Sequence, residues 1–259
     1  MIEVHNLTFG YSATEDRQIL KGVDFAAKTG KLTALIGTNG AGKSTLLKTI
    51  MGILKGKGEI SVNGKPVSQY STKDFSSTVS YLSQDNDCKV NLSVFEVVML
   101  GRMGSMSFRV SDEDIAATQE VLERLNLQGF ASRSIMELSG GQRQLVFMAQ
   151  ALVKEPKILI LDEPTSALDL HKQFDLLTLL KNLTQENDFT TLVTLHHLDL
   201  AAMFADEIIV LKEGRVYAQG APKDIFTEAM MEDVYRVKTK IYMDDNGLPH
   251  VIPLEAIIN

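Results

Sequence analysis

A single nine-residue stretch constrains the fold of this chain more than any other feature. Residues 37–45 read Gly-Thr-Asn-Gly-Ala-Gly-Lys-Ser-Thr and match the phosphate-binding pattern G-x-x-x-x-G-K-[ST]. An apolar segment, residues 32–36, precedes the stretch, and residues 46–51 have the composition of a helix. Glycines leave backbone N–H groups free to surround an anion, and the following helix directs the positive end of its dipole at the same place. The sequence therefore predicts a strand, a phosphate-binding loop and a helix, and with them a nucleotide site.

The pattern assigns separate tasks to the side chains of this loop. Lys43 is expected to reach the β- and γ-phosphates, and the hydroxyl of Ser44 is expected to bind Mg²⁺. An ordinary glycine-rich turn is a poor alternative, because chance matches should arise about 0.01 times in a chain of this length. The predicted nucleotide-binding residues of the loop are Gly37, Asn39, Gly40, Ala41, Gly42, Lys43, Ser44 and Thr45.

Composition excludes several classes of protein. The formal net charge of −7 and the lack of a basic run argue against nucleic acid as a partner, because phosphate contacts dominate nucleic-acid affinity. The single cysteine, Cys88, cannot form an internal disulfide and fits a reducing compartment. No apolar stretch approaches the ~20 residues that span a bilayer, and the N-terminus lacks the pattern of a signal peptide. We expect a cytoplasmic protein that binds no nucleic acid.

A second predicted helix begins with glycines. Ser139 and Gln142 fit a capping box, and residues 143–152 continue as a helix. Gly140 and Gly141 in its first turn cost roughly 1 kcal/mol each relative to alanine, so we expect another group to approach this backbone closely. Bare N–H groups and a serine hydroxyl at a helix N-terminus form an anion site. Two phosphate sites in one chain suggest a nucleotide enclosed between them.

Adjacent acids follow a predicted buried strand. Residues 158–161 are continuously apolar, as expected for a central parallel strand, and Asp162 and Glu163 come next, before Pro164. Open parallel sheets bind their ligands at the carboxyl ends of the strands. Asp162 is therefore expected to hold Mg²⁺ through water, and Glu163 to take a proton from attacking water.

Three further side chains are candidates by position alone. Tyr11 ends a strand near the loop, where it could stack on adenine or serve as a rim tyrosine. His196 and His197 follow a buried strand predicted at residues 190–195. Because side chains alternate along a strand, the two imidazoles are expected to point in different directions, one of them towards the γ-phosphate.

Hydrophobic periodicity and turn residues predict the remaining elements. Ile115, Leu122 and Leu125 recur at helical spacing and predict an amphipathic helix over residues 112–125. A helix beginning at Pro222 is expected to carry Ile225, Phe226 and, further on, Met230 and Met231 as core filler. Other strands are expected over residues 1–9, 19–25, 78–83 and 207–216, with hairpin turns at Asn63-Gly64 and Asn246-Gly247.

The chain resembles the ATP-binding subunits of ABC transporters over nearly its whole length. The motifs of that family occur in the expected order at residues 37–45, 84, 138–142, 158–163, 166–169 and 196. The resemblance implies an α/β fold, with a P-loop NTPase core of mainly parallel sheet, an N-terminal antiparallel β subdomain and an inserted helical subdomain. It divides the single ATPase domain into the core with its β subdomain at 1–84 and 156–228, the helical subdomain at 85–155 and a C-terminal extension at 229–259.

The same resemblance implies roles for individual residues. Tyr11 becomes the aromatic that stacks on adenine, and Gln84 senses Mg²⁺ and the γ-phosphate. Ser139 closes over the ATP of the opposite subunit, Glu163 becomes the general base, and His196 becomes the switch histidine. Further contacts with ATP are implied for Gly140, Gly141, Gln142 and Asp169.

A narrower resemblance concerns the transported substrate. Residues 92–102 and 246–253 are similar to importers of iron-siderophore, haem and cobalamin. This implies a homodimeric ATPase at the cytoplasmic face of the membrane that uses ATP and Mg²⁺, docks on integral membrane permease subunits and indirectly serves an extracytoplasmic substrate-binding protein. Two positions depart from the family pattern: Thr38, where proline is common, and His197, where aspartate usually follows the switch histidine. The H-x-L-x-x-A pattern favours His196 as the switch.

Other functions compete with this interpretation. An importer ATPase for another substrate, such as an oxyanion, fits the same motifs. Soluble ABC ATPases of chromosome maintenance or DNA repair carry long coiled coils or a DNA-reading domain between the motifs, and this sequence has neither. Translation-associated ABC proteins need two cassettes in one chain, whereas this length allows one. A small-molecule P-loop kinase would lack the Gly140-Gly141 helix start. Residues 84–101 contain no catalytic acid and are expected to form the surface for the permease, with Glu96 among the exposed positions.

Overall fold

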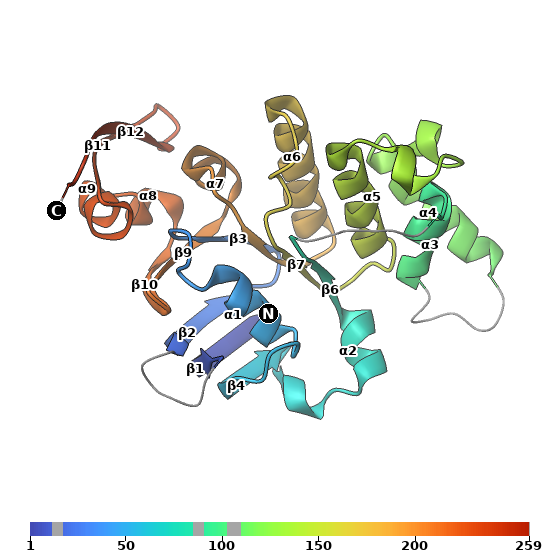
Figure 1. The fold of residues 1–259 in the computed structure, drawn as a ribbon, viewed down its shortest axis with the longest axis horizontal. Helices are drawn as coiled ribbons and strands as arrows, with labels where there is room; N and C mark the ends of the chain where they lie inside the picture. Colours follow the sequence, from blue (N-terminus) through green and yellow to red (C-terminus); the bar gives the residue numbers. More distant parts are fainter. Residues whose placement is uncertain (12–17, 85–90, 103–109, 259) are drawn as a thin grey trace. The chain divides into compact units, whose positions relative to one another are not determined.

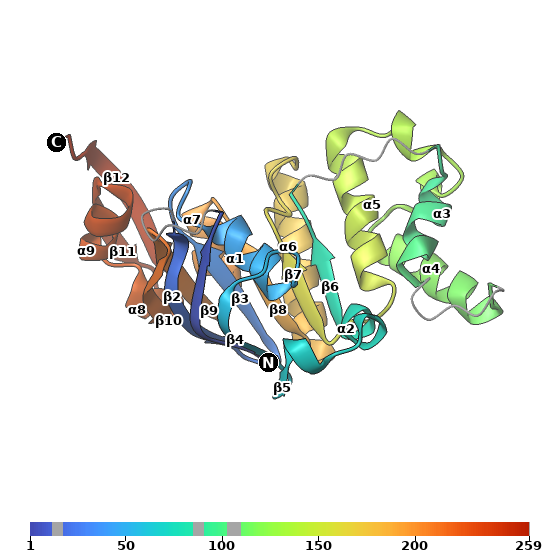
Figure 2. The ribbon, with the colours of Figure 1, turned by 60° about the horizontal axis from the view of Figure 1, so that its bottom comes forward.

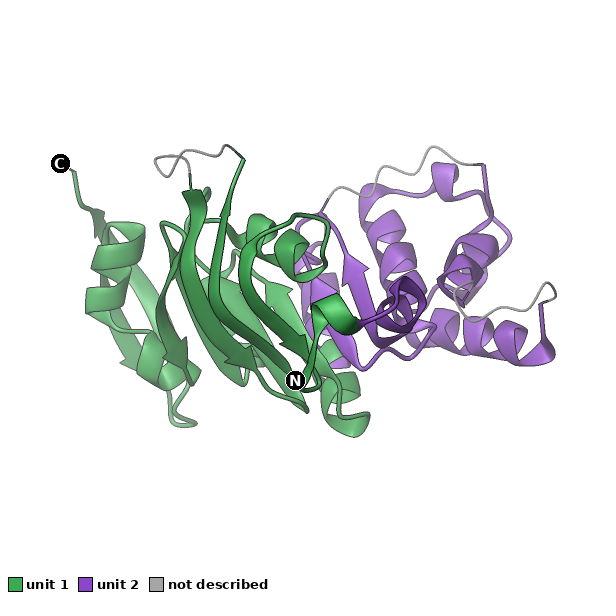
Figure 3. Cartoon of the chain, turned by 90° about the horizontal axis from the view of Figure 1, so that it is seen from below, with its two compact units in different colours: residues 1–69, 180–259 green, residues 70–179 purple. Residues whose placement is uncertain are grey.

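The computed structural model describes residues 1–11, 18–84, 91–102 and 110–258 (Figure 1). Cys88 lies outside these ranges. The chain divides into two compact units, residues 1–69 with 180–259 and residues 70–179 (Figure 3). The division expected from the sequence, with a helical subdomain at 85–155, stays a prediction, because the second unit also includes the strands and helices that flank that range.

An antiparallel sheet forms the N-terminal part of the first unit. It consists of β1 (Ile2–Gly10), β2 (Gln18–Ala27), β4 (Lys57–Val62) and β5 (Lys65–Pro66), in the order β2-β1-β4-β5. The turn between β4 and β5 lies at Asn63-Gly64, whose φ angles of 49° and 75° are the left-handed values that a two-residue hairpin turn requires. The antiparallel sheet and its turn are therefore confirmed.

The other sheet strands of the first unit are mainly parallel. Strand β3 (Lys31–Ile36) pairs in parallel with β8 (Thr190–Thr194) on one side and β9 (Glu207–Lys212) on the other. Strand β10 (Arg215–Gly220) is antiparallel to β9. Residues 32–36 and all of β8 are buried, which explains why these segments show no polar alternation. Helices α1 (Lys43–Ile50) and α7 (Leu198–Phe204) follow β3 and β8.

The helix predicted from Pro222 onwards is broken in the structure. It consists of α8 (Pro222–Ile225), α9 (Glu228–Met230) and a short π-helix, Met231–Tyr235. The break lies at Thr227, whose hydroxyl accepts a hydrogen bond from the N–H of Met230 and so starts a new helix. Met230 and Met231 are both buried, so their expected role as core residues is confirmed.

The C-terminal segment forms the hairpin that its turn residues predict. Strand β11 (Val237–Met243) pairs antiparallel with β12 (Pro249–Ala256), and Gly247 in the turn has a φ of 76°. The carboxylate of Asp244 accepts hydrogen bonds from the N–H groups of Leu248 and Asn246, which close the turn. These bonds, that from Leu248 first, lower the pKa of Asp244.

The second unit combines a pair of parallel strands with a group of helices. Helices α3, α4 and α5 pack against one another, and β6 pairs in parallel with β7 (Figure 2). The helix preceding β6 was not expected from the sequence. The elements are α2 (Thr72–Thr78), β6 (Val79–Leu82), α3 (Val94–Met99), α4 (Asp112–Arg124), α5 (Gly140–Leu152) and β7 (Ile158–Leu161), while α6 (Leu170–Glu186) begins in this unit and ends in the first.

Capping boxes start α3, α4 and α5, and the one at α5 confirms the box predicted at Ser139. Their N-cap residues are Ser93, Ser111 and Ser139. The buried face of α4 differs from the prediction, because Ile115 is 37% exposed whereas Asp114 is buried. Asp114 turns inward because it pairs with an arginine from the end of α3, and this places the neighbouring Ile115 towards solvent.

Arg102 joins three segments of the second unit. Its Nε lies 2.5 Å from Asp114 Oδ1 at the start of α4, and its Nη1 donates a 3.1 Å hydrogen bond to the carbonyl of Val153 after α5. The bond from Arg102, followed by those from Ser111, lowers the pKa of Asp114 to about 2. The carboxylate therefore stays ionised at neutral pH and holds the ends of the helices together. In the described ranges, none of the helices combines the length and apolar character needed to cross a membrane.

Candidate functional site

The phosphate-binding loop lies between β3 and α1 in the first unit, as predicted. Gly37 approaches its surroundings closely: a Cβ there would lie 2.2 Å from the carbonyl oxygen of Leu211 in β9. Gly40 is in the left-handed region with a φ of 79°, and a Cβ there would meet no atom within 4 Å. The loop is thus fixed by packing at its first glycine and open at its middle one, as an anion cradle requires.

Lys43 is the first residue of α1 and is buried within the loop. Its Nζ donates hydrogen bonds of 2.8 Å to the carbonyl of Gly37 and 3.1 Å to that of Thr38. The ammonium is therefore already held by the loop that it is expected to complete around phosphate. Ser44 and Thr45 follow in the first turn of α1 and are half-buried. This set of donors fits the phosphates of a nucleoside triphosphate. The hydroxyl of Ser44 is a hard oxygen ligand of the kind that Mg²⁺ prefers.

Tyr11 and His196 are the other sequence candidates in the first unit. The Tyr11 ring is 70% exposed and meets the edge of Phe9 at a centroid distance of 5.0 Å. It therefore has a free aromatic face supported by a neighbouring ring, as stacking on a base requires. His196 follows β8, His197 precedes α7, and both side chains are exposed.

Asp162 and Glu163 follow β7 in the second unit, at the carboxyl end predicted. Asp162 is only 2% exposed, whereas Glu163 is half-buried. Glu163 has a φ of 52°, a left-handed conformation that costs a non-glycine residue on the order of 1 kcal/mol. Its Oε2 accepts a 2.8 Å hydrogen bond from Nε2 of Gln84. The structure thus joins two residues that lie far apart in the chain: Gln84, which the resemblance assigns to Mg²⁺ and the γ-phosphate, and Glu163, which is expected to take a proton from attacking water.

Ser139 and Gln142 form the predicted capping box at the start of α5. Ser139 Oγ accepts from the N–H of Gln142, and Gln142 Oε1 accepts from the N–H of Ser139. The two glycines between them differ in their surroundings. A Cβ on Gly140 would meet nothing within 4 Å, which leaves that backbone open to a ligand. A Cβ on Gly141 would lie 2.9 Å from the carbonyl oxygen of Ala167, so that glycine is explained by the chain itself.

Asp169 ends the loop that follows Glu163. Its Oδ1 accepts a 3.0 Å hydrogen bond from the N–H of Lys172, and its Oδ2 lies 3.4 Å from the Lys172 ammonium. The backbone hydrogen bond is the largest of the causes that lower the pKa of Asp169. Asp169 therefore supports the start of α6 and remains an exposed anion.

Sequence reasoning missed two residues that touch these segments. The amide of Gln144 in α5 bonds to the loop at residues 163–167, and Tyr235 from the π-helix bonds through its hydroxyl to the backbone N–H of Gly37. Burial raises the pKa of Tyr235, and the bond to Gly37 offsets part of that effect. Neither residue belongs to a short motif. Only the position of Gln144, three residues after Gly141, could have indicated that it faces the same segment as Gly141.

The sequence that forms this site matches the profile of a known family. Residues 20–166, more than half of the chain, match the profile described as ABC transporter. The chain belongs to the ABC transporter family. A relative of this ABC cassette is the iron(3+)-hydroxamate import ATP-binding protein FhuC of Bacillus subtilis (strain 168). It is 37% identical over 246 residues, which make up 94% of this chain and 90% of the relative.

Solved structures of ABC proteins have the same fold. A metal-chelate type ABC transporter in an inward-facing conformation superposes with a TM-score of 0.82 and 29% identity, covering 98% of this ABC cassette and 97% of that chain. A dimeric ATP-binding cassette, MJ0796, bound to ADP and Pi in a post-hydrolysis state, superposes with a TM-score of 0.77 and 29% identity, over 86% and 99% of the two chains. The expected fold, a largely parallel α/β core with an antiparallel N-terminal sheet, is therefore confirmed.

Proposed function

We propose that this ABC ATPase powers import of a metal chelate, of the iron-siderophore, haem or cobalamin type, through a membrane permease. The observation that carries the ATPase assignment is the bond between Gln84 and Glu163, because it unites a phosphate-sensing amide with a carboxylate that can act as base. The substrate class is supported by FhuC, an iron(3+)-hydroxamate importer subunit, and by the superposition on a metal-chelate type transporter.

The working unit proposed is a head-to-tail homodimer with an ATP at each interface site. The phosphate loop of one subunit and Ser139 of the other would hold the same nucleotide, since one chain carries both halves of the composite site. The dimeric MJ0796 cassette supports this arrangement. Gly140 supports it too, because its open backbone leaves room for a phosphate against the N-terminus of α5.

Each side chain then has a separate task in hydrolysis. Lys43 and the loop N–H groups hold the phosphates, and the Tyr11 ring stacks on the adenine of ATP. Glu163 accepts a proton from the attacking water, and His196 contacts the γ-phosphate. Ser44, Gln84 and, through water, Asp162 are proposed to hold Mg²⁺, which when bound neutralises charge on the phosphate oxygens. Asp169 is proposed to contact the nucleotide at the subunit interface.

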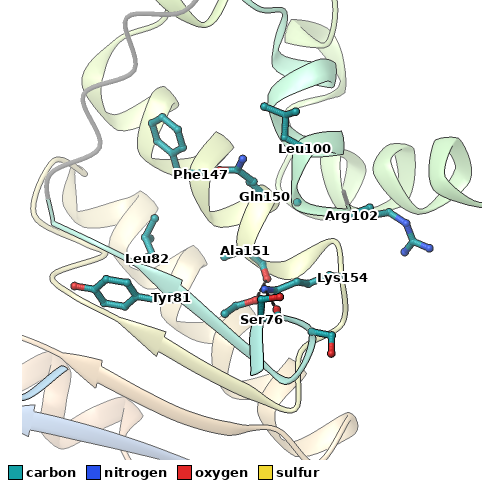
Figure 4. Close-up of a pocket in the computed structure, with 12 residues that line it drawn as sticks. Ser76, Tyr81, Leu82, Leu100, Arg102, Phe147, Gln150, Ala151 and Lys154 are labelled. Carbon is teal, nitrogen blue, oxygen red and sulfur yellow. Dashed lines mark hydrogen bonds between the residues drawn. The ribbon is translucent and has the colours of Figure 1, made fainter. Parts of the chain in front are cut away.

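The permease is proposed to dock on the second unit, at the C-terminal end of the predicted surface of residues 84–101. A pocket of about 340 Å³ lies there between β6, α5 and the turn at Leu100–Arg102 that follows α3 (Figure 4). Its wall includes Leu82, Leu100 and Phe147, and Leu100 is 41% exposed. Glu96 is a poor probe of this surface, because its carboxylate accepts hydrogen bonds from the N–H and Oγ of Ser93 and caps α3. Changing it would disturb the helix as well as the surface.

Transport by reconstituted vesicles tests this function. Vesicles should hold the chain with a permease of the iron-siderophore, haem or cobalamin importer type, Mg-ATP on the chain's side and the matching substrate-binding protein on the other. We expect ATP-dependent uptake of a ferric siderophore, haem or cobalamin, and none with Glu163→Gln. Uptake of molybdate alone would favour the oxyanion alternative, and hydrolysis without uptake of any of these substrates would reject the proposed import function.

A matched pair of variants tests the docking surface in the same vesicles. Leu100→Arg places a charge in the pocket, whereas Ile115→Arg places one on the exposed face of α4, outside the pocket lining. We expect uptake to be lost with Leu100→Arg and kept with Ile115→Arg. Hydrolysis by the isolated chain, measured alongside, separates a docking defect from a catalytic one. Equal uptake by both variants would mean that the permease docks elsewhere.

A further inference from the structure

The side chain of Gln144 bridges two points of the loop that carries the predicted base. Its Nε2 donates a 3.0 Å hydrogen bond to the carbonyl oxygen of Glu163, and its Oε1 accepts a 3.2 Å bond from the N–H of Ala167. A carboxamide is suited to this bridge because one planar group offers both a donor and an acceptor. Gln144 is half-buried and lies on α5, five residues after the Ser139 cap.

The bridged loop contains a strained residue. Glu163 has a φ of 52°, and such a conformation persists only where the surrounding contacts determine it. Its carbonyl oxygen also accepts bonds from Ser166, at 3.0 Å from the hydroxyl and 3.3 Å from the N–H. Of the groups named here that donate to the Glu163 carbonyl oxygen, the Gln144 amide is the one that comes from outside the loop. Removing it should therefore allow the Glu163 backbone to relax, and its side chain to move with it.

A second contact joins the same two segments independently of Gln144. Gly141 in the first turn of α5 packs so closely on Ala167 that a Cβ would lie 2.9 Å from the carbonyl oxygen and 3.2 Å from Cδ2 of Leu168. The start of α5 is thus joined to the loop at 163–168 by two kinds of contact: the hydrogen bonds of Gln144 and the close packing of Gly141 on Ala167. A displacement of one segment is transmitted to the other, because packed backbones do not deform independently.

These contacts link groups that serve different nucleotides under the proposed function. Ser139 and Gly140 face the ATP held by the partner subunit, whereas Glu163 acts on the ATP held by its own subunit. We propose that Gln144 is a positioning residue that couples the two ATP sites of the dimer, by relaying the position of the first turn of α5 to Glu163. When the partner's nucleotide fixes that turn, the Gln144 amide holds the Glu163 backbone in its strained, active conformation.

Kinetics of Gln144→Leu test this proposal, which rests on the proposed function. Leucine keeps the helix propensity and the approximate size but removes both hydrogen bonds. We expect kcat for ATP hydrolysis by the purified full chain to fall about tenfold, while KM for ATP stays within about twofold. The Hill coefficient for ATP should fall from about two towards one, because the sites no longer communicate. A general loss of structure would instead weaken ATP binding.

A matched control and a conservative variant complete the test. Gln119→Leu makes the same change at an exposed position of α4 and should leave kcat, KM and the Hill coefficient unchanged. Gln144→Glu keeps the acceptor for Ala167 but loses the donor to Glu163, so it should show the same loss of kcat and cooperativity. This variant is measured in the same way, and it carries the test if Gln144→Leu does not fold.

Two results separate failure of this proposal from failure of the proposed function. A parental chain that hydrolyses ATP, with Gln144 variants whose kcat and Hill coefficient are unchanged, would overturn the coupling role alone. A parental chain that does not hydrolyse ATP would overturn both. Amide hydrogen exchange of a peptide covering residues 163–168 gives a readout that needs no hydrolysis. We expect faster exchange in Gln144→Leu than in the parent, and equal exchange would contradict the bridge.

Discussion

The side-chain amide of Gln84 donates a 2.8 Å hydrogen bond to the carboxylate of Glu163. Gln84 follows β6 and Glu163 follows β7, and these strands are parallel neighbours, so their carboxyl ends meet at one edge. The bond fixes one carboxylate oxygen of Glu163, the proposed base. The orientation of that carboxylate therefore depends on the position of Gln84 after β6. Leu82, at the end of β6, also lines the pocket that is proposed as the permease surface, so docking there would act close to Gln84.

Loss of the Gln84 amide should therefore slow hydrolysis. We expect Gln84→Ala to lower kcat about tenfold or more, because Glu163 loses the donor that orients it. ATP affinity should change little, since the phosphate loop is intact. Steady-state kinetics over a range of Mg²⁺ concentrations measure both quantities. An unchanged kcat would mean that the bond has no part in catalysis.

The two histidines should differ in their effects. We expect His196→Ala to lower kcat about a hundredfold with ATP affinity retained, because the lost group is proposed to act on the γ-phosphate during hydrolysis. His197→Ala serves as the matched control and should remain within about threefold of the parent. ATPase kinetics and equilibrium binding of ATP check both variants. The reverse order of effects would place the switch at His197.

The two glycines at the start of α5 should differ in stability. Gly141→Ala forces a Cβ against the backbone of Ala167, which should lower the free energy of unfolding by about 1–3 kcal/mol. Gly140→Ala meets open space and gains helix propensity, so stability should stay the same or rise by up to about 1 kcal/mol. Urea unfolding of both variants measures the difference. Equal losses would show that the two positions are equally crowded.

The pair Arg102–Asp114 should make stability depend on pH. The folded-state pKa of Asp114 is lowered from its ordinary 3.8 to about 2, first by Arg102. The stabilisation is therefore fully present above the unfolded-state pKa and is lost as pH falls towards about 2. We expect Asp114→Asn to lower the urea midpoint clearly at about pH 7 and less at about pH 3. A matched change, Asp112→Asn, should show no such dependence, and a pH-independent loss in Asp114→Asn would contradict this account.

Local patterns predicted most of the fold because their physical causes are local. The Ser139–Gln142 capping box and the Asn63-Gly64 turn depend on a few adjacent residues, and both are confirmed. The break at Thr227 was missed although its cause, a hydrogen bond from Met230, is also local, because the apolar spacing continues across it. The exposure of Ile115 was missed because it depends on a contact of the neighbouring Asp114. In the second case that contact is Arg102, twelve residues away from its partner.

The candidate site likewise divides into residues that local patterns predict and residues that depend on tertiary contacts. The phosphate loop and the acids after β7 follow from short patterns, and the structure places them as expected. The bridge from Gln144 and the strained backbone of Glu163 depend on tertiary contacts that no spacing along the chain indicates. Gly141 illustrates how the two levels differ: the sequence indicates close approach by some group, and the structure identifies that group as Ala167.

The central claim is a composite ATPase formed by two copies of this chain, and ATP-dependent dimerisation of Glu163→Gln tests it most directly. This variant keeps the groups that bind nucleotide but lacks the base, so bound ATP should persist and hold the dimer together. The matched control, Lys43→Ala combined with Glu163→Gln, removes the loop ammonium and should stay monomeric. Light scattering with Mg-ATP should give a dimer carrying about two ATP molecules for Glu163→Gln. A Glu163→Gln chain that binds ATP yet remains monomeric would contradict the account.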